Sequence, residues 1–168
     1  GNRMIDLSAG LPPKAPTDST ATLVRSLRRI AQAIDVRSRE IARLTGLTLP
    51  QLLVLQSIRD LGEVSTSAIS RDVSMSPPTV VAVLDKLEAK GMAVRYRSTI
   101  DRRIVHVRLT EAGRGALASS PGLFGDGFIS GFGRLSADDR AAMATAVDRL
   151  ATMMQPRPPA FSEDGETG

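Results

Sequence analysis

The chain has 168 residues, enough for one compact domain with extra helices, and its 42% hydrophobic and 24% charged residues are typical of a soluble globular protein. It has no cysteine and one histidine, which excludes disulfides, thiolate chemistry and a structural zinc site. Aromatic residues make up 3%, too few for a platform that stacks on single-stranded nucleic acid. The longest apolar run, Val80 to Leu84, is far shorter than a membrane helix, and no basic and apolar leader opens the chain. We therefore expect a cytoplasmic protein without a membrane span or signal peptide.

The net charge of +4 is concentrated in one quarter of the sequence. Residues Arg71 to Arg114 contain nine basic and five acidic side chains, and the rest of the chain is balanced. A local positive excess is typical of a surface that binds a polyanion, with a solvated charged face as the equally common alternative.

The chain begins and ends in segments with the composition of flexible tails. Residues 1–19 hold three prolines among small and polar residues and predict a flexible arm, and residues 155–168 predict a flexible acidic tail. Between them, apolar residues recur in steps of three and four from Leu23 to Leu44. This stripe predicts a long helix over residues 20–46 that packs along one seam.

Three further helices are predicted in the next stretch, each opened by a side chain at helix N-cap spacing. These N-cap residues are Thr48, Ser65 and Ser76. The first helix ends near Gly62, the short second helix ends at Val73, and the third begins with Pro77 and ends at Gly91.

After Gly91 the hydrophobic period changes from helical to two. Val94 and Tyr96 alternate with two arginines, and a second alternating run follows from Val105 to Leu109. The pattern predicts a β-hairpin with one face on the core and the other basic.

The rest of the chain predicts three more helices. The first is capped at Thr110, the second occupies the phenylalanine-rich stretch 121–133, and the last runs from Ser136 to Met154. The wing and the three short helices are too small to cover the apolar stripes of the first helix and of the C-terminal helices. Residues 20–46 and 114–154 are therefore expected to form a dimer interface. A monomer core is the alternative.

The order helix, short helix, turn, helix and hairpin predicts a winged helix-turn-helix domain over residues 47–113. The fold class is therefore mainly α with a small β-hairpin wing, flanked by N- and C-terminal dimerisation helices. A helix of this kind fits the major groove of double-stranded DNA, and the hairpin tip can reach a neighbouring minor groove.

Three runs of sequence also resemble a known family. The stretch Ser76–Gly91, the turn Asp101-Arg-Arg103 and the run Val107–Gly113 are similar to the core signature of MarR-type transcriptional regulators. The resemblance covers residues 20–154 and implies an obligate homodimer that represses transcription until a small ligand relieves it. An aromatic or lipophilic acid is the default expectation for that ligand, and its binding residues are not predicted. Two symmetric recognition helices would read a pseudo-palindromic operator.

The resemblance also implies roles for individual residues, carried over by position. Those on the major-groove face or at adjacent phosphates are Ser76, Pro78, Thr79 and Lys86. Arg103 would enter the minor groove with its guanidinium held by Asp101, and Arg102 and Arg97 would contact phosphates. Lys86 and Lys90 have the alternative role of complementing the dipole at a helix C-terminus.

Val81 and Ala82 depart from the family pattern, which often has a polar residue followed by Arg or Lys at these places. Contact with thymine methyl groups is an available substitute for polar base reading. The alternative function is a winged-helix protein–protein interaction module that does not read DNA. An enzyme is not expected, because the lone His106 lies on a predicted strand among arginines with no nucleophile motif, and no cofactor or metal is implied.

Overall fold

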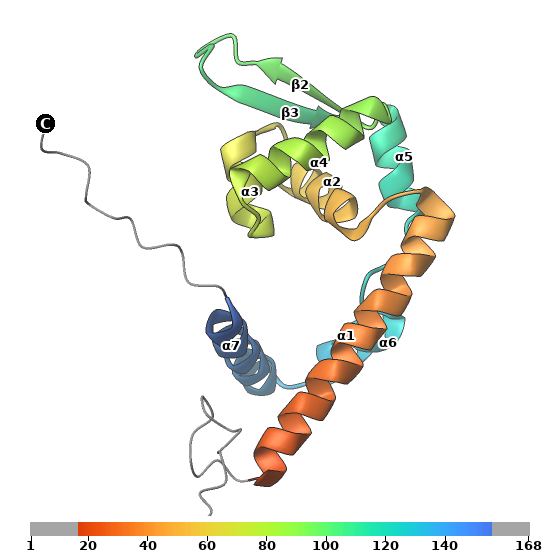
Figure 1. Cartoon of the computed structure of the whole chain (residues 1–168), viewed down its shortest axis with the longest axis vertical. Coiled ribbons are helices and arrows are strands. Elements are labelled where there is room, and N and C mark those ends of the chain that lie inside the picture. The colour runs from red at the N-terminus through yellow and green to blue at the C-terminus, as the bar shows by residue number, and fades with distance from the viewer. Residues whose placement is uncertain (1–16, 156–168) are drawn as a thin grey trace, which may run out of the picture. The chain divides into compact units, whose positions relative to one another are not determined.

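The computed structural model describes residues 17–155, which fold into seven helices and three strands (Figure 1). Residues 1–16 of the predicted arm (1–19) and residues 156–168 of the predicted tail (155–168) lie outside the described residues, whereas residues 17–19 are already part of the first helix. The first five helices and the strands form one compact unit ending at Leu123, and the last two helices form a second unit that begins at Phe124.

The first helix, α1 (Thr17–Thr45), ends where Gly46 takes a φ of 72° and donates its amide N–H to the carbonyl of Ala42. Its predicted apolar stripe is present, but Ile41 is the one residue of that stripe that is fully buried. Leu23 and Ile30 remain 45% and 54% exposed. The stripe therefore leaves part of its apolar surface exposed in a single chain.

The helices α2 (Leu49–Leu61), α3 (Thr66–Val73) and α4 (Pro77–Ala89) are the predicted helix-turn-helix. All three predicted N-caps are confirmed, because each side chain accepts a hydrogen bond from the backbone N–H three residues later. At α2 the bond is reciprocal, since Gln51 Oε1 accepts from the Thr48 N–H.

These three helices and the sheet share one core. Its buried side chains come from the end of α1, from all three helices and from two strands of the sheet, and burial of a large apolar side chain stabilises the fold by about 1.5–3 kcal/mol. The largest of them are Ile41, Leu47, Leu52, Leu55, Ile69, Leu84 and Leu87.

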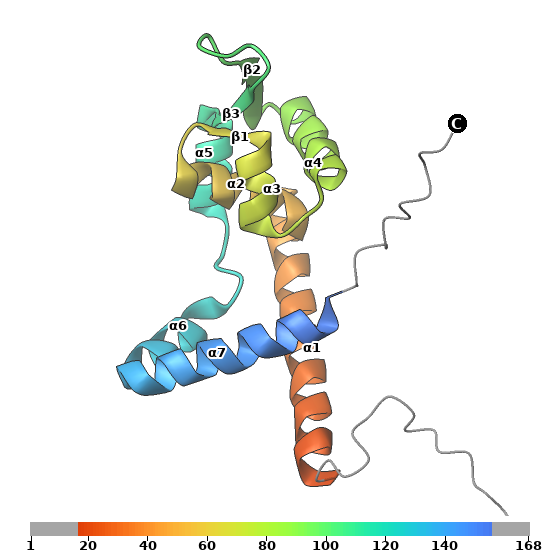
Figure 2. The same ribbon diagram turned by 90° about the vertical axis from the view of Figure 1, so that its left-hand side faces the viewer.

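The sheet has the strand order β1-β3-β2 and is antiparallel throughout. Strands β2 (Ala93–Arg97) and β3 (Val105–Leu109) form the predicted hairpin, and β1 (Val64–Ser65) adds a third strand beside β3. The sequence did not predict β1, because two residues are too few to display a period of two. Figure 2 shows the hairpin tip extending beyond the surrounding helices.

The hairpin is as predicted, but the side chains of β2 that face the core are not the expected ones, Val94 and Tyr96. Register pairs Val94 with Arg108 and Tyr96 with His106, so these four side chains share the outer face. Arg95 is paired with the buried Val107 and lies on the inner face. The inner face accepts this arginine because carboxylates on α4 pair with it, and alternation alone cannot reveal that tertiary contact.

Helix α5 (Glu111–Ser119) begins directly after the wing and is capped by Thr110, as expected. Its start lies so close to the preceding loop that a Cβ on Gly113 would stand 2.1 Å from the carbonyl oxygen of Met92. Only glycine fits this position. The Thr110 N–H and hydroxyl bond to the carbonyls of Met92 and Gly91, at 3.1 and 2.6 Å.

The second unit consists of α6 (Gly125–Arg134) and α7 (Ala137–Met154), which confirms the two predicted C-terminal helices. Neither helix buries any residue. Phe128 stacks between Phe124 and Phe132 along α6, with ring centroids 5.1 and 5.6 Å away.

No single helix within residues 17–155 is long and apolar enough to cross a bilayer. Taken together, α1 and α2 have the length and composition of a membrane span, but the chain bends by 76° between them.

Candidate nucleic-acid interface

The four residues expected at the major groove all lie exposed on α4 or at its N-cap. Ser76 caps the helix, and its Oγ lies 2.8 Å from the hydroxyl of Thr79. Val81, 42% exposed, and Ala82 lie on the exposed side of the same helix. The exposed surface of α4 thus combines hydroxyls, small apolar groups and the ammonium of Lys86, all of which suit base edges, thymine methyls or phosphates.

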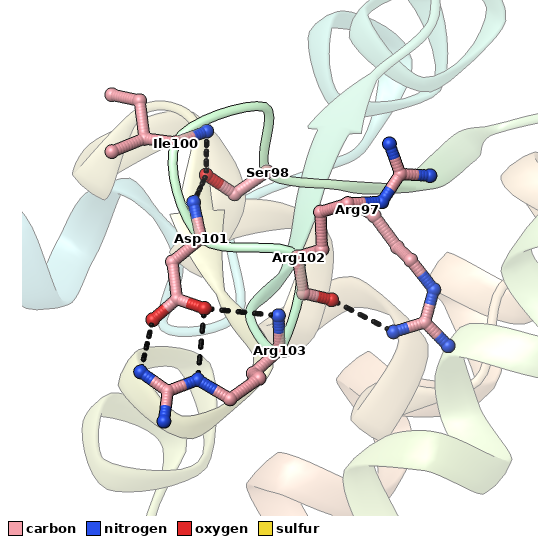
Figure 3. Close-up of polar contacts among 6 residues, drawn as sticks. All are labelled: Arg97, Ser98, Ile100, Asp101, Arg102 and Arg103. Atoms are coloured by element: carbon pink, nitrogen blue, oxygen red, sulfur yellow. Dashed lines mark hydrogen bonds and ion pairs between the residues drawn. The ribbon is translucent and has the colours of Figure 1, made fainter.

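The wing tip is shaped by Ser98, a residue to which the sequence assigned no role. Its side chain is buried, and its Oγ accepts the backbone N–H groups of Ile100 and Asp101, both at 3.2 Å (Figure 3). The turn closes through bonds between Ser98 N and Ile104 O and between Ile104 N and Asp101 O. In a sequence, the available signal for such a contact is a serine at the start of a polar turn, because its hydroxyl can accept the backbone N–H groups of the residues that follow.

This turn holds Asp101 and Arg103 together. The Arg103 Nε and Nη2 donate to the two carboxylate oxygens of Asp101 at 3.0 and 2.9 Å, and the Arg103 backbone N–H donates to Oδ1 at 3.1 Å (Figure 3). The side-chain bond, followed by the backbone bond, lowers the pKa of Asp101, and the same side-chain bond raises the pKa of Arg103. The predicted pairing of these two side chains is therefore present in the DNA-free protein.

Arg97 and Arg102 are both exposed near the tip. Arg97 Nη1 donates to the backbone carbonyl of Arg102 at 2.9 Å, so part of its guanidinium supports the wing backbone (Figure 3). Arg97 is the last residue of β2, and Arg102 lies in the turn that follows it.

The wing is joined to α4 by Arg95, a second residue that the site prediction did not include. Its Nη2 contacts Asp85 and also Glu88, the latter at 3.0 Å, while its backbone N–H donates to Glu88 Oε1 at 2.6 Å. The side-chain bond is the largest cause of the lowered pKa of Glu88 and of the raised pKa of Arg95. Helix and wing are therefore held as one surface.

A cleft of about 360 Å³ lies apart from this surface, between the end of α2, β3 and α5. Three arginines line it, but Arg59 pairs with Asp60 and Arg114 pairs with Glu111. Arg108 lies over the ring of Tyr96 at 5.9 Å, and Glu63 is also part of the lining. The acids balance the arginines at this cleft. The positive excess therefore lies at the wing tip, because α4 itself carries one lysine and two acids.

Comparison with known proteins matches the same part of the chain. The sequence profile of the MarR family matches residues 47–105. The chain is 31% identical over 101 residues to YwhA of Bacillus subtilis (strain 168), an uncharacterized HTH-type transcriptional regulator, a match that covers 58% of this chain and 70% of YwhA. It is 33% identical over 88 residues to the HTH-type transcriptional repressor MdtR of the same organism, covering 52% of this chain and 57% of MdtR. The chain spans 41 to 70% of the length of six curated relatives.

Among solved structures, the fold is similar to that of BpsR from Bordetella bronchiseptica, whose DNA binding is regulated by 6-hydroxynicotinic acid. The TM-score is 0.59 at 25% identity, and the match covers 77% of this chain and 98% of BpsR. The family profile covers the helix-turn-helix, β2, the wing turn and the first residue of β3, where the exposed helix face and the arginine-bearing wing tip also lie. The chain belongs to the MarR family of DNA-binding transcriptional regulators, which are not enzymes.

Proposed function

We propose that the protein is a homodimeric, sequence-specific repressor that releases its operator when a small organic ligand binds. The observation that carries the proposal is the wing tip, where a guanidinium is oriented by Asp101 while the Arg103 side chain stays 90% exposed. A charged group that is held in place and left open to solvent is suited to insertion into a narrow minor groove.

In this proposal α4 enters the major groove. Ser76, Pro78, Thr79 and Lys86 then line the base edges or the adjacent phosphates, and contacts from Val81 and Ala82 to thymine methyls supply part of the reading. Arg102 and the free N–H groups of Arg97 bind the phosphates beside the minor groove.

Homodimer formation is supported by the apolar surface that one chain leaves uncovered. Ile30 on α1, Ile129 on α6 and Val147 on α7 are 54%, 64% and 58% exposed. Exposed apolar side chains on both units of the chain support an interface, and a symmetric pair of chains is the commonest way to cover them. Two recognition helices about 34 Å apart would then read a pseudo-palindrome.

Repression and ligand control are supported by relatives. MdtR is a repressor, and the DNA binding of BpsR is regulated by a small aromatic acid. A ligand that changes the separation of the two recognition helices needs a coupling free energy of only about 1–3 kcal/mol to alter operator occupancy.

The experiment combines light scattering with a titration of DNA. The operator is obtained by letting the purified protein select duplexes from a random library, and its affinity is measured by fluorescence anisotropy at several salt concentrations. The proposal predicts a dimer and a selected pseudo-palindrome. It also predicts that the logarithm of the binding constant falls linearly with log[salt]. A protein that selects no sequence is instead a winged-helix interaction module, the function that the apolar Val81 and Ala82 would favour.

A further inference from the structure

One side chain joins three helices at the end of α4 that lies away from the wing tip. Lys90 is the C-cap residue of α4, and its Nζ donates to the carbonyl oxygen of Gly46 at 2.7 Å and to Gln51 Oε1 at 2.8 Å. Gly46 follows the last residue of α1, and Gln51 lies in the first turn of α2. The two acceptors are 44 and 39 residues away from Lys90 in the sequence.

Both acceptors are suited to an ammonium group. The carbonyl of Gly46 lies at the C-terminal, negative end of the α1 dipole, where helix carbonyls lack intrahelical partners. Gln51 is 7% exposed, and its Oε1 already accepts the N–H of Thr48 in the capping box of α2. Lys90 therefore binds to the junction of α1 and α2 through two of its three N–H donors.

This contact adds a link between two elements that share α2 as a neighbour and otherwise pack on different elements. α1 packs on α2 and α5, whereas α4 packs on α2, α3 and β2. α1 carries the uncovered apolar stripe and α4 carries the exposed face proposed to read DNA. A bond between their ends fixes the direction of the reading helix relative to the helix at the dimer interface.

We propose that Lys90 is a positioning residue for operator recognition, which sets the separation of the two α4 helices in the dimer by holding the end of α4 to the α1–α2 junction. The inference rests on the proposed homodimer. It also differs from the role that the sequence suggests for this lysine, which is to complement the dipole of its own helix.

Such a residue acts on half-site spacing. One inserted base pair moves a half-site by about 3.4 Å and rotates it by about 34°. A dimer with fixed recognition helices discriminates strongly against that change. Loss of the Lys90 contact lets α4 change its direction relative to α1. The preferred operator then binds less tightly, and the affinity for the mis-spaced operator falls by a smaller factor.

The test compares wild type with Lys90→Met, which keeps the aliphatic stem and removes all donors, and with Lys90→Arg, which restores them. Arg59→Met is the matched control, because it removes one positive charge from an exposed side chain that pairs with the adjacent Asp60. Each protein is titrated with the selected duplex and with duplexes carrying one base pair more or fewer between the half-sites.

For Lys90→Met we expect about tenfold weaker binding to the selected duplex. The spacing preference, which is the Kd for a mis-spaced duplex divided by the Kd for the selected duplex, should fall at least about fivefold. The slope of log Kd against log[salt] stays unchanged, and Lys90→Arg recovers most of the spacing preference. Arg59→Met keeps that preference at the wild-type value.

Two results overturn the inference. A salt slope that falls by about one unit with spacing preference intact makes Lys90 a phosphate contact. Unchanged binding makes it only a helix-end complement. Should Lys90→Met fail to fold, Lys90→Gln is measured in the same way, since its shorter side chain cannot bridge both acceptors. A monomeric or non-binding wild type would contradict the proposed function itself, before any variant is compared.

Discussion

Asp101 accepts two side-chain hydrogen bonds from Arg103, yet the Arg103 side chain is 90% exposed. An exposed ion pair of this kind contributes at most about 1 kcal/mol to folding stability. Its effect is to restrict the directions in which the guanidinium can point. Asp101 is charged at neutral pH, and its lowered pKa extends the pairing to more acidic pH.

Arg103→Ala tests the role of this oriented group. We expect operator binding to weaken by about 1–3 kcal/mol, because one minor-groove contact is lost, while the melting temperature and the dimer remain as in wild type. Fluorescence anisotropy and thermal unfolding measure the two quantities. Arg114→Ala is the control, since Arg114 is also exposed and paired with an acid, Glu111, but lies on α5. Unchanged DNA binding, or early melting of Arg103→Ala, would make the wing assignment wrong.

A second prediction concerns the acid limb of the stability curve. The folded-state pKa of Glu88 lies below its ordinary value of 4.5, because the Arg95 side chain and then the Arg95 backbone N–H bond to the charged carboxylate. A group with a lowered folded-state pKa stabilises the fold fully above about pH 4.5, and this contribution is lost as the pH falls through the lower folded-state value.

The unfolding free energies of wild type and Glu88→Gln, measured in urea, therefore differ at neutral pH and converge as the pH falls below the folded-state pKa of Glu88. Since the Glu88 side chain is 33% exposed, we expect a difference of only about 1 kcal/mol at pH 7. Glu111 pairs with Arg114, but its own side chain is 90% exposed, so Glu111→Gln should differ little from wild type at any pH. A Glu88→Gln curve parallel to that of wild type at all pH values would show that the Arg95 contact does not stabilise the fold.

A third prediction uses two glycines of α5. Gly113→Ala places a methyl group 2.1 Å from the backbone oxygen of Met92, so the start of the helix must shift and the protein loses about 2 kcal/mol or more of stability. Gly115→Ala meets nothing within 4 Å, and the better helix propensity of alanine should stabilise the protein by about 0.5–1 kcal/mol. Opposite signs in urea unfolding confirm the close approach, and equal signs contradict it.

The sequence predicted those elements whose determinants are local. N-cap side chains such as Thr48 and Ser76 act within three residues of their own position, so their helices begin where expected. The phase of β2 was predicted wrongly because Arg95 faces inward to reach Glu88, and that choice depends on a tertiary contact. Lys90 and its acceptor Gly46 show the same limit, since no local pattern connects residues 44 positions apart.

The residues proposed to bind DNA divide in a similar way. The sequence located the exposed α4 face and the Asp101–Arg103 pair through motifs that are short and contiguous. It could not find the buried Ser98 that shapes the turn, because a serine in a polar loop gives no sign of burial until the fold is known.

The last prediction concerns the dimer. Ile30 lies on the apolar stripe of α1 and is 54% exposed in one chain. Ile30→Glu would place an unpaired carboxylate inside the proposed interface, at a cost of about 3 kcal/mol or more per interface, so the dimer dissociates at concentrations at least about 100-fold higher than for wild type. Gln32→Glu adds the same charge away from the stripe and should leave the dimer intact. Light scattering over a dilution series measures both variants, and circular dichroism confirms that the winged-domain core, which excludes Ile30, stays folded. If Ile30→Glu remains as dimeric as Gln32→Glu, α1 does not form the interface, and Lys90 has no dimer helix through which to space the two copies of α4.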